Sequence, residues 1–333
     1  MSNRTTKKKK DKPKFIVLFG PTGSGKSGAF DLYYKKLRPK CERKDTTVTC
    51  NDGRLPPYFA SVDNFIENDK EYRDSMKTLS TNLLANLMSK SGSALRISSR
   101  RKQAMIQNQA QAMTDLYYRI RNKKGYNLQN ELGVLNSIKS AVDIGEARDI
   151  VFEITGTNPD TIKKICDDNL FEFALKSNPA LSEYAKLKTR YDVVVVVPFA
   201  SYILLQERIV GRFMSAAQRN PSSARMVPSG YKHLRNSEET ALQNLATLVR
   251  QRCVQSVMVY DNTSGPKAVE WFQLEIGPDG CQLLGLNKRL GQVGSAPFRK
   301  VVDEICIGRK KAREKKTQKR PTRRKKTEMM SGG

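Results

Sequence analysis

The fold of this chain is decided by one stretch near its start, Gly20-Pro21-Thr22-Gly23-Ser24-Gly25-Lys26-Ser27. The stretch fits the pattern G-x-x-x-x-G-K-[ST], which is typical of loops that bind nucleotide phosphates. An apolar run of strand formers, 15–19, precedes it, and a helical pattern over 25–38 follows it. Strand, glycine-rich turn and helix are the context that this motif requires. The sequence therefore favours a phosphate-binding loop over a plain Gly/Ser turn that happens to hold a lysine.

Each residue type in this loop has a physical role in holding a triphosphate. Glycines carry no Cβ, so the backbone can curl around the phosphates and direct its N–H groups inward. The helix that follows contributes the positive end of its dipole. We expect Lys26 to reach the β and γ phosphates, and the Ser27 hydroxyl to bind Mg²⁺. The loop therefore predicts ATP and Mg²⁺ as the cofactors of this protein.

Strand and helix patterns alternate along the middle of the chain. Strands are expected at 58–62, 149–155, 191–197 and 254–260, and helices at about 67–90, 95–122, 128–147, 160–176, 201–218 and 237–252. This alternation implies a parallel sheet with helices on both faces. The predicted fold class is α/β, a P-loop NTPase or kinase-type sheet with a helical insert and a small C-terminal β-hairpin.

Four regions are expected along the chain. The P-loop kinase domain covers 15–265, and a helical insert at about 64–147 is either a substrate-binding lid or a plain elaboration of the scaffold. A β-hairpin appendage is predicted over 266–308, around the turn Gly277-Pro278-Asp279-Gly280. Residues 1–14 and 309–333 lack apolar periodicity, so we predict two basic disordered tails.

The positive charge is concentrated at the two ends. Residues 1–14 carry seven basic residues and one acidic residue, a net of +6, and residues 309–328 carry twelve and two, a net of +10. Of the formal net charge of +27, this leaves +11 on the central part. The tails are candidates for nuclear import, for contact with nucleic acid or another polyanion, or for solubility alone. A nucleus or a virion is therefore a candidate location.

Cysteine spacing and hydropathy bear on the compartment. The six cysteines form no C-x-x-C pair, which disfavours a zinc site: Cys41, Cys50, Cys166, Cys253, Cys281 and Cys306. Sparse cysteines in a long chain indicate an intracellular, reducing compartment. Apolar runs stay well below the roughly 18 residues of a membrane helix, so no membrane partner is expected.

Candidate site residues follow the predicted strands, because ligands of open α/β sheets gather beyond the carboxyl ends of the strands. Lys26 follows the first strand and Asp63 the second, while Glu153 and Thr155 lie at the end of the third. Asp63 is placed to accept the proton of an acceptor hydroxyl, although a helix cap is the alternative. Glu153 is expected to hold Mg²⁺ through water or to bind the acceptor. Asp261, after the last strand, fits a cap or turn better.

A run of arginines supplies candidates for charge neutralisation. Arg208 and Arg212 share a helix face, because they lie four residues apart. Arg219 and Arg225 flank the helix-breaking Asn220-Pro221. Arginines on a closing segment neutralise charge on a transferred phosphoryl group. One or two of the four are expected to act and the others to be solvated. His233, the only histidine, fits a surface role better than catalysis.

The sequence resembles the zeta-toxin family of P-loop kinases over about residues 14–265. The resemblance is carried by the glycine-rich loop, by the segments 61–65, 151–156 and 207–228, and by 259–262. It implies an ATP- and Mg²⁺-dependent kinase in which Asp63 activates the acceptor hydroxyl. Glu153 and Thr155 match acceptor-binding positions, and Arg208 and Arg225 match arginines that contact the phosphates of ATP.

The leading hypothesis is a phosphotransferase that moves the γ-phosphoryl group of ATP to a hydroxyl acceptor that the sequence does not identify. The alternative is a nucleic-acid-associated P-loop NTPase or a 5′-hydroxyl polynucleotide kinase, which the basic tails favour. A third hypothesis is a binding module that kept the loop without turnover. A GTPase is disfavoured, because Asn287-Lys288-Arg289 lacks the aspartate of a guanine-reading motif.

Overall fold

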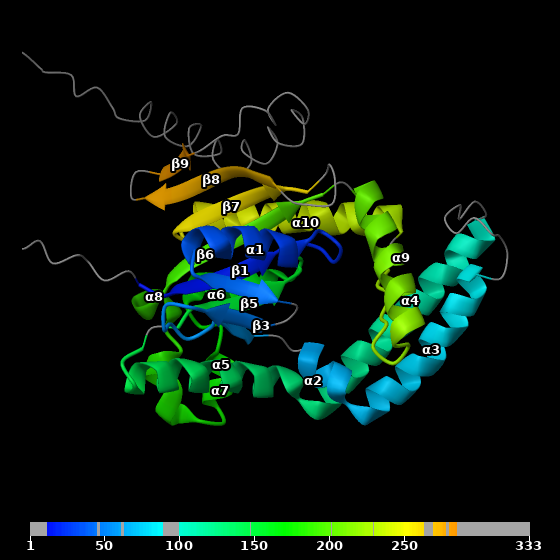
Figure 1. Cartoon of the computed structure of the whole chain (residues 1–333), viewed down its shortest axis with the longest axis horizontal. Coiled ribbons are helices and arrows are strands. Elements are labelled where there is room, and N and C mark those ends of the chain that lie inside the picture. The colour runs from blue at the N-terminus through cyan, green and yellow to red at the C-terminus, as the bar shows by residue number, and fades with distance from the viewer. Residues whose placement is uncertain are drawn as a thin grey trace, which may run out of the picture.

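The computed structural model describes residues 12–44, 47–60, 63–88, 100–146, 148–200, 202–228, 230–262, 269–277 and 280–284 (Figure 1). The basic segment 309–333 and residues 1–11 of the other tail lie outside these ranges. What the sequence predicts for them, and for the triplet 287–289, stays a prediction.

In the part of the chain described, seven strands form one sheet in the order β4-β5-β1-β6-β7-β8-β9. Their bounds are β1 Lys14–Phe19, β4 Tyr58–Ala60, β5 Ile150–Ile154, β6 Asp192–Phe199, β7 Ser256–Asp261, β8 Val269–Gly277 and β9 Gly280–Leu284. The strands from β4 to β7 run parallel, and β8 and β9 continue the sheet antiparallel to them. With β1 at the centre, the loop after it is flanked by the ends of β5 and β6.

Helices cover both faces of this sheet, as Figure 1 shows for α1 on one side and for α5 and α7 on the other. Their bounds are α1 Lys26–Leu37, α5 Tyr126–Asp143, α6 Pro159–Asp167, α7 Glu172–Leu175, α8 Leu187–Arg190, α9 Tyr202–Arg219 and α10 Tyr231–Arg250, with a 3₁₀-helix, η1, at Pro179–Tyr184. Successive side chains of a strand point to opposite faces. Phe15 and Val17 of β1 therefore join the core under α5, α6 and α10, whereas Ile16 and Leu18 pack with α1.

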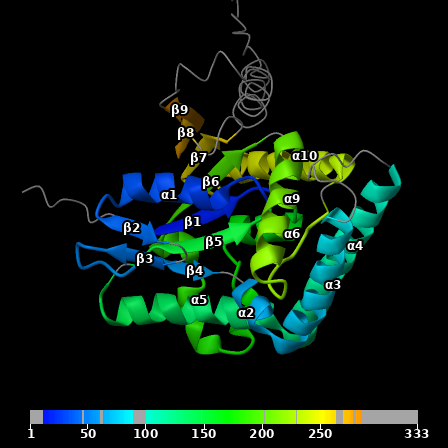
Figure 2. The same ribbon diagram turned by 45° about the vertical axis from the view of Figure 1, so that its right-hand side comes forward.

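The helical insert forms an arm beside the sheet. The arm consists of α2 Asp63–Asn68, α3 Lys70–Met88 and α4 Arg100–Lys124, whereas the last helix of the insert, α5, packs against the sheet. Figure 2 shows α3 and α4 lying along each other, with α9 between this arm and the sheet. The arm shares a second hydrophobic core with α9, in which Met76 and Met113 of the arm and Phe213 of α9 are fully buried. Because α9 contributes to this core, the arm is packed against the rest of the α/β domain.

The predicted α/β class and the C-terminal hairpin are confirmed. The hairpin β8–β9 pairs with β7 and so extends the central sheet, where the sequence had suggested an appendage. A second hairpin was not predicted. It joins β2 Cys41–Lys44 to β3 Thr47–Cys50 within a stretch that looked irregular. Its buried residue Val48 packs into the core beneath α1.

Two disulfides join four of the cysteines, Cys41 to Cys50 and Cys166 to Cys253. The first links the two strands of the unpredicted hairpin. The second ties α6 to the segment just before β7. Bonded pairs differ from the reduced thiols that a reducing compartment implies, and the compartment itself stays a prediction. Cys281 lies in β9, and Cys306 lies outside the described residues.

Candidate active site

The glycine-rich loop joins the end of β1 to the start of α1, as the motif predicts. Gly25 has a φ of 91°, a conformation that side chains with a Cβ rarely adopt. A Cβ on this residue would lie 2.0 Å from the Nδ2 atom of Asn262. The N–H of Gly20 donates to the carbonyl oxygen of Ile154, 3.2 Å away, so the loop is also tied to β5. The glycines are therefore required both by the turn and by close contact.

Lys26 is the first residue of α1 and only 8% exposed. Its Nζ atom donates to the carbonyl oxygens of Gly20, at 2.7 Å, and Pro21, at 3.2 Å. The carboxylate of Glu153 lies 3.4 Å from the same atom. Burial lowers the pKa of Lys26, and the neighbouring charge of Glu153 acts in the opposite direction. The ammonium group of Lys26 is thus bound by carbonyl oxygens of its own loop and by Glu153. A bound phosphate would have to replace these contacts.

Asn262 connects the loop to the last parallel strand. Its side-chain amide donates to the carbonyl oxygen of Ser24 at 2.7 Å, and its own backbone N–H donates to Phe199 at 2.8 Å. Arg208 of α9 donates through Nη2 to the backbone oxygen of Asn262 at 3.0 Å and, at 3.4 Å, to its Oδ1. The predicted residue Arg208 is therefore linked to the loop through Asn262.

Asp63 begins α2, just beyond the strand β4, where the sequence predicts it. Its Oδ1 atom accepts a 2.6 Å hydrogen bond from the hydroxyl of Tyr117 in α4. Its Oδ2 atom lies 3.7 Å from the Nη2 atom of Arg225. The guanidinium of Arg225 stands over the ring of Tyr117, 4.0 Å from its centroid. These three residues come from α2, from α4 and from the segment between α9 and α10, and they form one cluster.

The acceptor-binding candidates Glu153 and Thr155 lie at the end of β5. Glu153 is 53% exposed beside Lys26, so its carboxylate is accessible to a ligand. The hydroxyl of Thr155 lies 3.0 Å from that of Thr157. Just after them, Gly156 accepts a 2.7 Å bond from the amide of Asn244 in α10. The segment after β5 is therefore held by α10, while the Glu153 side chain stays exposed.

One cavity of about 1020 Å³ brings most of these residues together. The predicted residues that line it are Pro21, Thr22, Lys26, Asp63, Glu153, Thr155 and Arg225. Its charged lining is balanced, with Lys26, Arg121, Lys163, Lys164 and Arg225 against Asp63, Glu131, Glu153, Asp160 and Asp167. The other predicted residues do not belong to this lining as far as the structure describes it. They lie in the loop, at the start of α1 (Ser27) or, for Arg208, in α9.

The four arginines differ in their positions. Arg225 reaches Asp63, and the charge of Arg212 acts on both Lys26 and Glu67. Arg219 is exposed and donates to the carbonyl oxygen of Ser215 within its own helix. Of the four arginines, Arg225 is the one that lines the cavity in the described part of the chain. The expectation that one or two of them act in catalysis stays a prediction. His233 is exposed and lines the cavity at its rim.

The residues present fit a triphosphate and a metal ion. Ser27 is exposed at the start of α1, where its hydroxyl is accessible. Glu153 offers a carboxylate oxygen 3.4 Å from the Nζ atom of Lys26. The hydroxyl of Ser24 is buried, and its oxygen has no hydrogen-bond partner among the described residues. Hydroxyl and carboxylate oxygens are ligands that Mg²⁺ prefers, so the donor set suits this ion.

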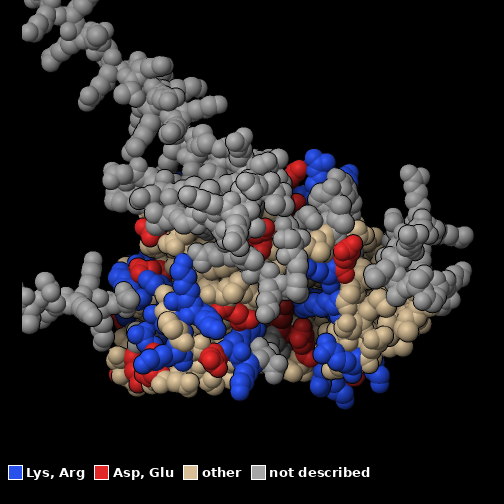
Figure 3. Space-filling model, turned by 45° about the horizontal axis from the view of Figure 1, so that its top comes forward, with Lys and Arg blue, Asp and Glu red and all other residues tan. Residues whose placement is uncertain are grey.

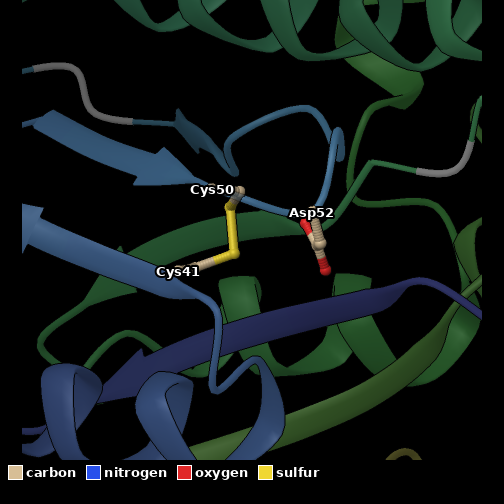
Figure 4. A group of neighbouring side chains, drawn as sticks. All are labelled: Cys41, Cys50 and Asp52. Carbon is tan, nitrogen blue, oxygen red and sulfur yellow. A yellow bond between two sulfur atoms is a disulfide. The ribbon is translucent and has the colours of Figure 1, made fainter.

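A second group of metal-ligating residue types lies in the hairpin, where Cys41, Cys50 and Asp52 have ligand atoms within 4.8 Å of one another (Figure 4). The two sulfurs are bonded to each other, so neither is a thiolate. Asp52 pairs with Arg54 at 3.2 Å. Metal binding by cysteine needs the deprotonated thiol, and we therefore do not treat this group as a metal site.

Charge on the molecular surface is mixed. Figure 3 shows Lys and Arg side chains in several clusters, with Asp and Glu between them, on one face. Within the described part of the chain, none of the helices has both the length and the apolar character that crossing a bilayer would need. The expected polyanion contacts of the tails concern residues outside the described ranges and stay a prediction.

The sequence matches no protein-family model and no curated protein. Among solved structures, the chain is similar to one from the PezAT chromosomal toxin–antitoxin system of the human pathogen Streptococcus pneumoniae. Identity is 14%, 95% of this chain and 89% of that chain are covered, and the TM-score is 0.40. It is also similar to AvrRxo1-ORF1:AvrRxo1-ORF2, solved with sulphate ions and with ATP. There identity is 12%, coverage is 84% of this chain and 62% of that chain, and the TM-score is 0.34.

Proposed function

We propose that this protein is an ATP-dependent phosphotransferase that moves the γ-phosphoryl group to a hydroxyl of an acceptor bound in the cavity. The observation that carries the proposal is the meeting of Lys26, Asp63 and Arg225 at one cavity. Phosphoryl transfer needs charge neutralisation and an oriented nucleophile more than covalent chemistry. The loop lysine and Arg225 supply positive charge, and Asp63 supplies a carboxylate for the nucleophile.

The proposed step balances as a single displacement. The acceptor hydroxyl gives its proton to Asp63 while its oxygen forms a bond to the γ-phosphorus of ATP. The bond between that phosphorus and the bridging oxygen of the β-phosphate breaks, and ADP leaves with the electron pair. Lys26 binds the β and γ phosphates from the loop, and Arg225 neutralises negative charge on the group in transit. The proton on Asp63 then passes to solvent.

Ser27 and Glu153 are the residues that would hold Mg²⁺, the serine directly and the glutamate through water. When bound, the ion neutralises charge on the phosphates. Glu153 also faces Lys26 at 3.4 Å. A triphosphate in the loop would bind Lys26 in place of Glu153. The carboxylate of Glu153 would then be available to the metal or to the acceptor. Thr155, directly after β5, is proposed as a hydrogen-bonding partner of the acceptor.

The alternative is a nucleic-acid-associated NTPase or a 5′-hydroxyl polynucleotide kinase. Its support is the formal net charge of +27, more than half of it in the two tails. The cavity offers it no further support, because its lining carries as many carboxylates as cationic side chains. We therefore rank transfer to a small polar acceptor first. The basic tails are proposed to contact nucleic acid or another polyanion independently of the cavity.

Incubation with γ-labelled ATP and Mg²⁺ separates these functions. The full-length protein is given a mixture of hydroxylated metabolites, a 5′-hydroxyl oligonucleotide, or buffer alone. Label in a metabolite supports the first proposal, and label at the oligonucleotide end selects a polynucleotide kinase. Phosphate release that only nucleic acid stimulates selects the NTPase. Binding of Mg·ATP without turnover under any condition would contradict both enzyme hypotheses and leave the binding module.

A further inference from the structure

Tyr117 links two residues of the proposed mechanism although it comes from the helical insert. It lies in α4, 54 residues from Asp63 in the chain, and it is 7% exposed. Its hydroxyl donates the 2.6 Å bond to the Oδ1 atom of Asp63, and its ring lies beneath the guanidinium of Arg225. One side chain thus contacts both the carboxylate and the cation of the site through two different groups.

The hydroxyl bond fixes how the carboxylate is presented. Because Oδ1 accepts the short bond from Tyr117, the other oxygen, Oδ2, is the less engaged one, 3.7 Å from Arg225. A carboxylate held by one oxygen cannot rotate freely, and a base must lie within hydrogen-bond reach of the proton it takes. Burial raises the pKa of the Tyr117 hydroxyl, and the Asp63 charge adds to that effect. The hydroxyl therefore keeps its proton and stays a donor at neutral pH.

The ring contact fixes the arginine in a different way. A cation over an aromatic face is attracted by the ring without using its N–H groups. Burial by itself would lower the pKa of Arg225, but Asp63, Tyr72 and Tyr117 outweigh it and raise that pKa. The guanidinium is therefore always charged. Resting on a ring, it can offer donors to a phosphate in the cavity while its plane stays oriented.

We propose that Tyr117 is a positioning residue, whose hydroxyl orients Asp63 toward the nucleophile and whose ring holds Arg225 in place for the phosphates. This inference rests on the proposed function and deepens it. On this proposal the helical insert supplies a residue to the active site, which argues against a plain elaboration of the scaffold. The hydroxyl and the ring have separable tasks, which makes the proposal testable one group at a time.

Tyr117→Phe removes the hydroxyl and keeps the ring, and Tyr117→Leu removes both. The reaction followed is release of labelled phosphate from Mg·ATP by the full-length protein, with water as the acceptor. We expect Tyr117→Phe to lower kcat roughly 10- to 100-fold, the range for a lost bond to a charged group, and to leave KM for ATP within about twofold. Tyr117→Leu should lower kcat at least as much and also raise KM roughly 3- to 30-fold, through the lost ring contact.

Tyr34→Phe is the matched control. Its hydroxyl also donates to an aspartate, the Oδ2 atom of Asp149 at 3.2 Å, and Tyr34 does not belong to the described lining of the cavity. This variant should keep both kcat and KM. A Tyr117→Phe protein with the kinetics of the wild type would overturn the role of the hydroxyl. Equal loss of kcat in Tyr117→Phe and Tyr34→Phe would show a general effect on stability and would overturn the proposal as a whole.

Failure of the proposed function looks different. If the wild-type protein releases no phosphate and labels no acceptor, the phosphotransferase assignment fails, whatever Tyr117 does. The ring contact is then tested by calorimetric binding of Mg·ATP. Tyr117→Leu should bind it roughly 3- to 30-fold more weakly, and Tyr117→Phe should bind it as the wild type does. Equal affinity of the two variants would overturn the role of the ring.

Discussion

The side-chain amide of Asn262 donates a 2.7 Å hydrogen bond to the carbonyl oxygen of Ser24, across 238 positions of sequence. The bond joins the residue after β7 to the middle of the glycine-rich loop. The backbone oxygen of the same asparagine accepts a hydrogen bond from Arg208. The shape of the loop therefore depends on the far edge of the parallel strands as well as on its own glycines.

This contact predicts a large effect of Gly25→Ala. The new Cβ would lie 2.0 Å from the amide nitrogen of Asn262, and the alanine would have to keep the φ of 91° that Gly25 has. We expect loss of detectable Mg·ATP binding, measured by calorimetry, because the loop must open to make room. Gly28→Ala is the control. Gly28 lies within α1 with no atom near its Cβ position, so this change should raise stability by roughly 0.5–1 kcal/mol and leave binding unchanged.

Lys26→Met should abolish Mg·ATP binding, since the flexible cation that reaches the β and γ phosphates is removed. Lys35→Ala, at an exposed position in the last turn of the same helix, is the control and should bind as the wild type does. Normal turnover of ATP by the Lys26→Met protein would refute the assignment of the loop.

The same substitution makes a prediction about stability. Burial lowers the folded-state pKa of Lys26 below its unfolded value, so the charged lysine costs folding free energy at neutral pH. That cost fades as the pH rises through the folded pKa toward the unfolded one. Without nucleotide, Lys26→Met should therefore melt at or above the wild-type temperature at pH 7, and its advantage should shrink at alkaline pH. A clear drop in its melting temperature at pH 7 would contradict this reasoning.

Asp63→Asn should separate binding from transfer. The amide keeps the size of the side chain and the acceptor oxygen for Tyr117, but it cannot take the proton of the nucleophile. We expect Mg·ATP affinity within a few-fold of the wild type and a loss of turnover of roughly 10²- to 10⁴-fold. The measurement is label transfer under saturating ATP. Unchanged transfer would remove Asp63 from the mechanism.

Asp149 is predicted to be a structural carboxylate of large effect. It is 5% exposed, accepts two bonds from Arg38, at 3.0 and 3.1 Å, and accepts the backbone N–H of Lys14 at 2.8 Å. Asp149→Ala leaves the buried Arg38 without its main counter-charge and should cost roughly 3–5 kcal/mol of unfolding free energy. Asp192→Ala breaks a more exposed pair with Lys14 and should cost at most about 1 kcal/mol. Denaturant unfolding of the two variants provides the comparison.

The basic tails predict salt-dependent binding that is independent of catalysis. Deleting residues 1–13 and 309–333 removes most of the excess positive charge. Affinity for a double-stranded oligonucleotide, measured at several salt concentrations, should fall, and so should the slope of its logarithm against the logarithm of salt. The rate of ATP turnover should not change. Equal oligonucleotide affinity before and after deletion would leave the tails with a role in import or solubility.

Local patterns were enough to predict the central fold. The loop motif, the β-branched run of β6 and the alternation of strands with helices each depend on neighbouring residues, and the structure agrees with them. The expected positions of Asp63 and Glu153 follow from the same logic, since each closes a predicted strand. Interactions between distant segments were not predictable in this way. In the sequence, Tyr117 cannot be told from the other residues on the apolar face of a long helix. Its role becomes visible only when α4 packs against α2, where Asp63 lies.

Other differences have the same origin. The hairpin β2–β3 consists of two short strands with mixed polar residues, whose pairing only becomes favourable when Val48 is buried beneath α1. The hairpin after β7 was recognised from its turn, but its attachment to the sheet depends on an edge that no local pattern reveals. The contact of Asn262 with Ser24 follows from the strand order β4-β5-β1-β6-β7, which no local pattern reveals.

The bond between Cys166 and Cys253 closes a covalent ring that contains β6, α9 and α10, together with Arg208 and Arg225. A protease that nicks the segment 220–228 would leave a single species on a non-reducing gel, which separates into two fragments once a thiol reagent is added. Both arginines would stay tethered to the rest of the protein after such a cut. The polypeptide could thus be severed beside its active site and still not come apart.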